Sequence, residues 1–163
     1  MSKGKVWKYG DDVNTDVIFP GKYTYTITDV KEMAKYAMED LDSSFAKEVK
    51  EGDVIIAGKN FGCGSSREQA AFCLKEAGVA CIIAPSFSRI FYRNAINAAL
   101  PTIVNKEIPE IAQKNDEIEL FLEEGKVTLK GKEYNFPPLP ESVIGILKDG
   151  GLIPYLQKKL KNT

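Results

Sequence analysis

Two adjacent serines and an arginine stand in the glycine-rich segment NFGCGSSREQA, residues 60–70, and they are the side chains best suited to chemistry. Serine hydroxyls act as nucleophiles when a neighbouring base activates them, and a guanidinium binds a carboxylate through two parallel hydrogen bonds. Because the chain contains no histidine, Ser65 and Ser66 cannot belong to a Ser-His-Asp triad. Arg67 opens a predicted helix, where the macrodipole disfavours a cation unless an anion such as a substrate carboxylate lies beside it.

A purely structural interpretation of this segment is also open. Ser65 and Glu68 have the spacing of a capping box, in which the hydroxyl accepts from a free amide and the glutamate reaches back. Gly62 and Gly64 allow the backbone to turn and its amides to approach an anion. The segment fits neither GxGxxG nor the P-loop, so no nucleotide site is expected.

The composition predicts one globular domain over residues 1–163. Of these residues, 44% are hydrophobic and 28% are charged, which is enough for a sizeable core. The 22 basic and 23 acidic side chains are scattered, so neither nucleic acid nor a membrane surface is an expected partner. The start MSKGKVWKYG has no apolar signal core, and no run approaches the roughly 20 apolar residues that span a bilayer. A cytoplasmic location is therefore expected.

The three cysteines, Cys63, Cys73 and Cys81, fit neither a disulfide framework nor a CxxC metal site. Cys73 and Cys81 lie in apolar stretches and are expected to be core thiols. Without histidine, a zinc site or an iron-sulfur cluster held by this chain alone is not expected. Any metal therefore has to come from another chain.

The elements that must position the serine segment alternate between strand and helix. Strands are predicted at residues 5–9, 53–58, 79–85 and 101–105, the second and third of them buried, and helices at 29–38, 66–78 and 88–99. Asp29 is the expected cap of the first helix, with Glu32 at the capping-box position, and Gly78 should end the second helix. The strand-helix-strand order implies a parallel crossover.

Further elements extend this unit. Residues 10–28 are expected to form a long loop, residues 117–136 to form hairpins with turns at Gly125 and Gly131, and residues 140–150 and 152–160 to form helices. Together they predict an α/β fold with a mixed or barrel-like sheet. The serine segment follows a buried strand, and ligands bind at the carboxyl ends of strands in open α/β sheets.

Three motifs in this order, GDDVNTDVIFPGKY, GKNFGCGSSREQA and SFSRIFYRNAINAALP, closely resemble the small subunits of 3-isopropylmalate dehydratase, the isopropylmalate isomerase of leucine biosynthesis. The chain is also similar to archaeal homoaconitase small subunits and to the swivelling C-terminal domain of aconitase. The resemblance extends from about Lys5 to the C-terminal region. It implies a single swivelling β/β/α domain with a mixed, barrel-like sheet, as in the aconitase domain.

The resemblance also implies roles for the serine segment. Ser65 matches the catalytic base, which works as an alkoxide, while Ser66 and Arg67 match positions that hold a substrate carboxylate and stabilise the alkoxide. A serine hydroxyl is a very weak acid, so its environment has to favour the ionised form. The expected oxyanion cradle consists of backbone amides at Gly62, Cys63 and Gly64.

The implied reaction is a reversible dehydration and rehydration that interconverts 2-isopropylmalate and 3-isopropylmalate, making the protein a hydro-lyase. In the family a separate large subunit carries a four-iron four-sulfur cluster, so this chain should bind no cofactor itself and supply half of an active site. The expected partners are that large subunit and a small hydroxy acid. Two alternatives stay open, a homoaconitase-type small subunit acting on tricarboxylates and a non-catalytic anion-binding module.

The family resemblance assigns substrate choice to the loop Lys22, Tyr23, Thr24, Tyr25, Thr26 and Ile27. A tricarboxylate requires a cation, typically arginine, whereas an isopropyl group requires apolar surface. The loop has no arginine, which favours isopropylmalate, with Tyr25 or Ile27 offering apolar contact. Lys22 keeps tricarboxylates open, and the aromatic side chains could instead pack the loop or meet the large subunit.

The flanking motifs are expected to have mainly structural roles. The first motif should cap turns and orient its loop through Asp11, Asp12, Asn14 and Asp16. In the third motif, Ser88 is an expected helix cap, and Arg89 and Arg93 lie four residues apart on one helix face. Ordinary ion pairing is the favoured interpretation of these arginines, with bracing of the serine segment or a subunit contact as alternatives.

Overall fold

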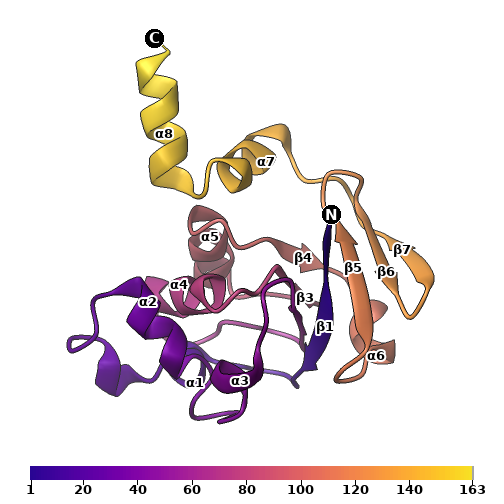
Figure 1. The fold of residues 1–163 in the computed structure, drawn as a ribbon, viewed down its shortest axis with the longest axis horizontal. Helices are drawn as coiled ribbons and strands as arrows, with labels where there is room; N and C mark the ends of the chain where they lie inside the picture. The colour runs from indigo at the N-terminus through magenta and orange to yellow at the C-terminus, as the bar shows by residue number, and fades with distance from the viewer. Residues whose placement is uncertain (163) are drawn as a thin grey trace.

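The computed structural model describes residues 1–162, which form a seven-stranded mixed sheet in the order β4-β3-β2-β1-β5-β6-β7 (Figure 1). The strands are β1 Ser2–Lys8, β2 Val54–Ile56, β3 Cys81–Ala84, β4 Thr102–Val104, β5 Glu117–Phe121, β6 Lys126–Leu129 and β7 Lys132–Asn135. Strands β1 to β4 are parallel, and β5 to β7 form an antiparallel meander joined to β1. The predicted parallel strands and hairpins are confirmed.

Helices fill most of the connections. They are α1 Thr15–Ile18, α2 Val30–Met33, α3 Phe45–Glu48, α4 Glu68–Glu76, α5 Arg89–Asn97, α6 Ile108–Ile111, α7 Glu141–Lys148 and α8 Leu152–Lys161, with 3-10 turns η1 Gly21–Tyr23 and η2 Ala34–Tyr36. Gly78 follows α4 with φ +105°, as expected of a helix-ending glycine. The predicted loop at 10–28 contains α1 and η1.

The helix predicted at 29–38 is broken into α2 and η2. Asp29 caps α2 as expected, with its carboxylate accepting from the Lys31 amide at 3.0 Å. Glu32 does not complete the capping box, because its carboxylate pairs with Lys35 at 2.8 Å. Met38, the last residue of the prediction, has φ +61°, which no α-helix accommodates.

Alternating side chains of the parallel strands belong to two separate hydrophobic cores, one on each face of the sheet. Trp7, Ile55 and Ile82 face the side covered by α2, α4 and α5. The opposite face is closed by the curl of the sheet, so that its apolar residues contact those of β5 and β6 and the helix α6. Burying one such aliphatic side chain contributes about 1.5–3 kcal/mol. The predicted mixed, barrel-like sheet is therefore confirmed, as a curled half-barrel.

The two core thiols are placed as predicted. Cys73 lies in the core on the helix side and Cys81 in the core inside the curl, and both are fully buried. Burial raises the pKa of each thiol, because the thiolate would lose its hydration. Both groups are therefore protonated, unreactive core residues.

Candidate active site

All three sequence motifs meet at the carboxyl ends of β1, β2 and β3. Residues 10–15 run beside residues 58–63, joined by the Gly58 amide to the Gly10 carbonyl at 2.9 Å and by the Thr15 amide to the Cys63 carbonyl at 2.9 Å. The third motif joins them at Phe61, whose carbonyl accepts from the Ser88 amide at 2.9 Å. Segments far apart in the sequence thus build one edge of the sheet.

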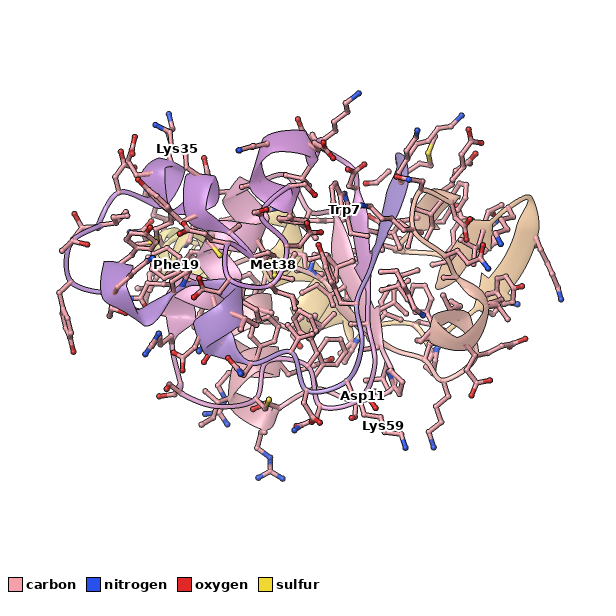
Figure 2. The ribbon with its side chains drawn as sticks, turned by 90° about the horizontal axis from the view of Figure 1, so that it is seen from below. Trp7, Asp11, Phe19, Lys35, Met38 and Lys59 are labelled. Carbon is pink, nitrogen blue, oxygen red and sulfur yellow. The ribbon has the colours of Figure 1, made fainter. Side chains whose placement is uncertain are left out.

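Side chains of the first motif hold this edge in place. The Asp11 carboxylate accepts from the Lys59 amide at 2.7 Å, and Figure 2 shows these two residues together at one margin of the molecule. The Asn60 side chain donates to Asp12 at 3.1 Å, and the Asn14 side chain caps α1. The loop-orienting roles expected of these residues are confirmed.

Two glycines shape the serine segment. Gly62 has φ +83°, and a Cβ at this position would lie 2.2 Å from Cγ of Phe91 on α5. Gly64 has φ +95°, but its surroundings are open, with the nearest side-chain atoms 3.5 Å away. The Gly62 amide donates to the Val13 carbonyl at 2.7 Å, so it is used by the fold. The expectation that the Gly62 amide donates to an oxyanion is therefore wrong. The glycine is needed instead because Phe91 packs where a side chain would lie.

Ser65 does not cap the helix, and the capping-box interpretation is wrong. Helix α4 begins at Glu68, the cap position is occupied by Arg67, and no side chain caps that end. The Ser65 carbonyl instead accepts from the Thr15 hydroxyl and from the Arg67 amide, both at 2.9 Å. Tertiary contacts thus fix the backbone of Ser65 and stop the helix short of it.

Ser65 and Ser66 are exposed residues at this edge. Within residues 1–162 neither hydroxyl makes a hydrogen bond, and the amides of Gly64, Ser65 and Ser66 donate to no other group of the chain. The serine pair therefore keeps its hydroxyls and neighbouring amides available for a ligand.

Arg67 is three-quarters buried and held from the first motif. Its Nη1 lies 2.6 Å from the Asp16 carboxylate and 3.5 Å from the Phe19 carbonyl. A Cβ at Gly21 would come within 3.0 Å of both terminal nitrogens, so the glycine makes room for the guanidinium. The carboxylate of Asp16, from the same chain, is thus the anion that the sequence predicted beside Arg67. Both contacts use Nη1, and in the described chain Nη2 and Nε form no hydrogen bond.

Replacing Arg67 with lysine is expected to raise KM for the hydroxy-acid substrate about 10- to 100-fold, because a point charge replaces a charge-assisted, planar pair of hydrogen bonds. Steady-state kinetics of the assembled enzyme measure this effect. Lys35→Arg, at an exposed position, is the control and should keep the wild-type KM. An unchanged KM for Arg67→Lys would show that the arginine serves only the Asp16 pair.

The loop expected to choose the substrate divides into packed and exposed parts. Tyr23 stacks on Tyr36 with ring centroids 4.2 Å apart and donates to Glu39, so it packs the loop, as one of the open alternatives held. Lys22 pairs with Glu39 at 3.5 Å. Tyr25, in contrast, is 94% exposed.

Two of the remaining loop residues, Thr24 and Ile27, line a hollow beside α4, whereas Thr26 is exposed. Ile27 is half-buried there, and the hollow has a volume of about 370 Å³. Its other walls are largely apolar and include Met33 and Phe72. The hydroxyl of Thr24 is buried without a hydrogen-bond partner in the described chain, and that of Thr26 donates to the Lys22 carbonyl at 3.5 Å.

The third motif departs from expectation at its cap residue and at its two arginines. Ser88 occupies the cap position of α5, but its side chain makes no capping hydrogen bond. Arg89 and Arg93 are exposed, and within residues 1–162 neither forms the ion pair that was favoured. Their partners therefore lie outside the described chain or in bulk water.

The cysteines of this chain do not fit an iron-sulfur cluster. Cys63 lies in the serine segment, whereas the two other thiols are buried in different cores. In the described part of the chain no group of three or more potential metal ligands comes together. No helix among the described residues has the length and apolar character needed to cross a bilayer.

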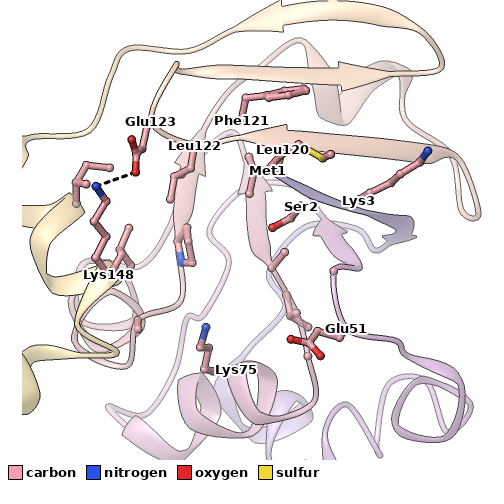
Figure 3. Close-up of a pocket in the computed structure, with 18 of the residues that line it drawn as sticks. Met1, Ser2, Lys3, Glu51, Lys75, Leu120, Phe121, Leu122, Glu123 and Lys148 are labelled. Carbon is pink, nitrogen blue, oxygen red and sulfur yellow. Dashed lines mark ion pairs between the residues drawn. The ribbon is translucent and has the colours of Figure 1, made fainter.

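A larger groove opens at the amino ends of the parallel strands and is separate from the serine segment (Figure 3). It has a volume of about 1200 Å³ and is lined by residues that precede β2, β3 and β4, such as Gly52, Val79 and Pro101. Glu123 and Lys148 form an ion pair of 2.9 Å across one end of it. The first two motif segments contribute no lining residue, and the third contributes only its end, Ala99 and Pro101.

Known proteins share both the sequence and the fold. Residues 13–107 match the Aconitase C-terminal domain family. The chain is 53% identical over 160 residues to 3-isopropylmalate dehydratase small subunit 1 of Thermotoga maritima, covering 97% of this chain and 96% of that protein. It is 50% identical over 163 residues to the isopropylmalate/citramalate isomerase small subunit of Methanocaldococcus jannaschii, covering 99% of this chain and 96% of the relative.

A solved structure extends this agreement to three dimensions. The crystal structure of 3-isopropylmalate dehydratase from Methanocaldococcus jannaschii superposes with a TM-score of 0.89 at 46% identity, covering 96% of this chain and 93% of that one. The family resemblance carried by the three motifs is confirmed. The chain belongs to the aconitase C-terminal domain family and, within it, to the small subunits of 3-isopropylmalate dehydratase.

Proposed function

We propose that this chain, as one domain, is the small subunit of a cytoplasmic 3-isopropylmalate dehydratase that interconverts 2-isopropylmalate and 3-isopropylmalate. The observation that carries the proposal is Ser65, an exposed residue where the three motifs meet, whose hydroxyl forms no hydrogen bond within residues 1–162. The high identity to named dehydratase small subunits supports the same reaction. A non-catalytic anion-binding module gives no reason for an unused serine pair.

In the proposed mechanism, Ser65 takes the proton from the substrate carbon through its Oγ, as the alkoxide. The backbone amides of Gly64, Ser65 and Ser66, which the fold leaves unengaged, supply hydrogen bonds to that oxygen together with the positive end of α4. One such donor contributes roughly 3–4 kcal/mol to a developing oxyanion. Several donors acting together are proposed to favour the alkoxide over the protonated hydroxyl.

Ser66 and Arg67 are proposed to hold the substrate carboxylate. The ion pair with Asp16 fixes the guanidinium, leaving Nη2 and Nε for the substrate. A guanidinium whose position is already fixed loses less conformational freedom when it binds, which strengthens the interaction. Asp16 is therefore a positioning residue for Arg67.

The four-iron four-sulfur cluster implied by the family does not fit the thiols of this chain, so we assign it to the large subunit. When bound there it supplies Lewis-acid chemistry toward the departing hydroxyl. The small subunit then contributes the proton-transferring serine and the carboxylate site. Catalysis accordingly requires both subunits.

Isopropylmalate is the substrate that the loop supports best. Lys22 is engaged by Glu39, which leaves the loop without a free cation for a third carboxylate. Tyr25 is exposed and can meet an apolar substituent, and Ile27 lines the apolar hollow beside α4. One relative is named for citramalate as well, whose methyl group is a smaller apolar substituent at the same carbon.

Tyr25→Arg is expected to shift the ratio of kcat/KM for homoaconitate over isopropylmalate by a factor corresponding to about 1–3 kcal/mol, because the guanidinium can neutralise the extra carboxylate. Steady-state kinetics with both substrates measure the ratio in wild type and variant. Lys31→Arg adds the same group at a nearby exposed position and serves as the control. A wild-type preference for homoaconitate, or an unchanged ratio in Tyr25→Arg, would refute the assignment.

The proposed function is tested by anaerobic reconstitution with a cluster-loaded large subunit. Ultraviolet absorbance follows formation of the unsaturated intermediate from isopropylmalate or citramalate, and its loss when homoaconitate, which is already unsaturated, is hydrated. We expect activity only when both chains are present, with isopropylmalate preferred over homoaconitate. Turnover by the small subunit alone, or inactivity of the stable complex toward all three acids, would contradict the proposal.

A further inference from the structure

The arginines of this chain are unusually placed. There are three, Arg67, Arg89 and Arg93, and every other basic side chain is lysine. All three lie in the second and third motifs. Arginine differs from lysine in its planar, weakly hydrated fork, which suits bidentate carboxylate recognition and protein interfaces. Arginine is therefore used here only around the serine segment, which indicates specific carboxylate partners.

Arg67 has such a partner in the first motif, whereas the other two arginines do not. Arg89 and Arg93 are exposed and four residues apart, so they lie on the same side of α5. Within the structure's described residues neither has an ion pair or hydrogen bond. Ile90, between them in sequence, is 48% exposed, so an apolar side chain accompanies the two cations.

This surface is held rigidly against the serine segment. The Ser88 amide at the start of α5 donates to the Phe61 carbonyl at 2.9 Å, and the rings of Phe61 and Phe91 pack edge to face with centroids 5.3 Å apart. Phe91 also fills the space that the missing side chain of Gly62 leaves. A partner that binds the outer side of α5 is therefore fixed relative to Ser65.

We propose that Arg89, Ile90 and Arg93 form a docking surface for the large subunit, which meets it with carboxylate side chains around an apolar contact. The inference rests on the proposed function, because a divided active site needs a contact that fixes Ser65 against the other chain. Arginine is enriched at such interfaces, and a buried Arg-carboxylate pair gives both orientation and affinity. The carboxylate of the small hydroxy acid is bound by Arg67 in the proposed site, so Arg89 and Arg93 are not needed to bind the substrate.

The test measures the Kd between the purified chain and the large subunit at about 0.05 M and about 0.3 M ionic strength, where screening differs strongly. We expect Arg89→Glu with Arg93→Glu to weaken binding at least about 100-fold at the lower ionic strength and to reverse the salt dependence, because like charges then face each other and salt screens their repulsion. Arg89→Lys with Arg93→Lys should weaken binding less. The control Lys75→Glu with Lys161→Glu reverses two exposed charges elsewhere and should bind as wild type.

Circular dichroism and Tm of the free variants check that they fold, as expected for exposed positions. At saturating large subunit the charge-reversed variant should keep the wild-type KM for isopropylmalate. An unchanged Kd would overturn the inference, and an unchanged Kd with a raised KM would place the arginines in the substrate site instead. If the wild-type chain itself fails to bind the large subunit, both this inference and the proposed function fail. If the wild type binds and the variants bind equally, only this inference fails.

Discussion

Ser65→Ala is expected to lower kcat of the assembled enzyme about 100- to 10,000-fold, the range typical of a residue that transfers a proton in the transition state. The substrate carboxylate is held by Ser66 and Arg67 in the proposed site, so KM should change little. Stopped-flow or steady-state assays with saturating large subunit measure both constants.

The stability of Ser65→Ala separates catalysis from capping. Because α4 begins at Glu68 and the Ser65 hydroxyl makes no hydrogen bond within residues 1–162, the free energy of unfolding should change by less than about 0.5 kcal/mol. Loss of a true cap would cost about 1 kcal/mol. Ser43→Ala, at an exposed serine in a turn, is the matched control and should retain full turnover. Near-normal kcat for Ser65→Ala would remove the residue from the mechanism.

Gly62→Ala is expected to have the largest effect on stability, with a loss of about 2–5 kcal/mol. The added Cβ would lie 2.2 Å from Cγ of Phe91, and this ring is buried and cannot move aside. Such overpacking costs about 1–3 kcal/mol. The residue also has φ +83°, and the left-handed conformation costs a non-glycine residue a further 1–2 kcal/mol or so.

Gly64→Ala provides the matched control for the backbone contribution. Its φ of +95° is similar, but the added Cβ would meet nothing closer than 3.5 Å. Only the conformational cost, about 1–2 kcal/mol, should therefore appear. Urea unfolding followed by circular dichroism measures both variants. If the two substitutions were equally destabilising, the contact with Phe91 would not be the cause.

The sheet could be predicted from the sequence because its strands carry strong local signals. Short buried runs such as residues 53–58 and 79–85 are bounded by glycine and proline, and the segment between them has helical spacing. Three other elements, α1, α3 and α6, are single helical turns of four residues and were not predicted. Elements of this length are stabilised by packing rather than by propensity, so no local pattern identifies them.

The contacts around the serine segment could not be predicted from the sequence. The capping-box spacing at Ser65 is a local preference worth about 1 kcal/mol, and the contact between Thr15 and the Ser65 carbonyl overrides it. The pairing of Asp16 with Arg67 joins two motifs far apart in the chain. Gly21 was likewise missed, since its role depends on the guanidinium that packs over it. Only tertiary structure reveals such partners.

The central claim is that Ser65 of this chain completes an active site whose other half belongs to the large subunit. The most direct measurement adds increasing Ser65→Ala chain to a fixed, active mixture of wild-type chain and cluster-loaded large subunit. The variant should compete for the same partner, so activity should fall in proportion to the share of large subunit it occupies and approach zero. Activity that persists when Ser65→Ala chain occupies nearly all of the large subunit would contradict the claim.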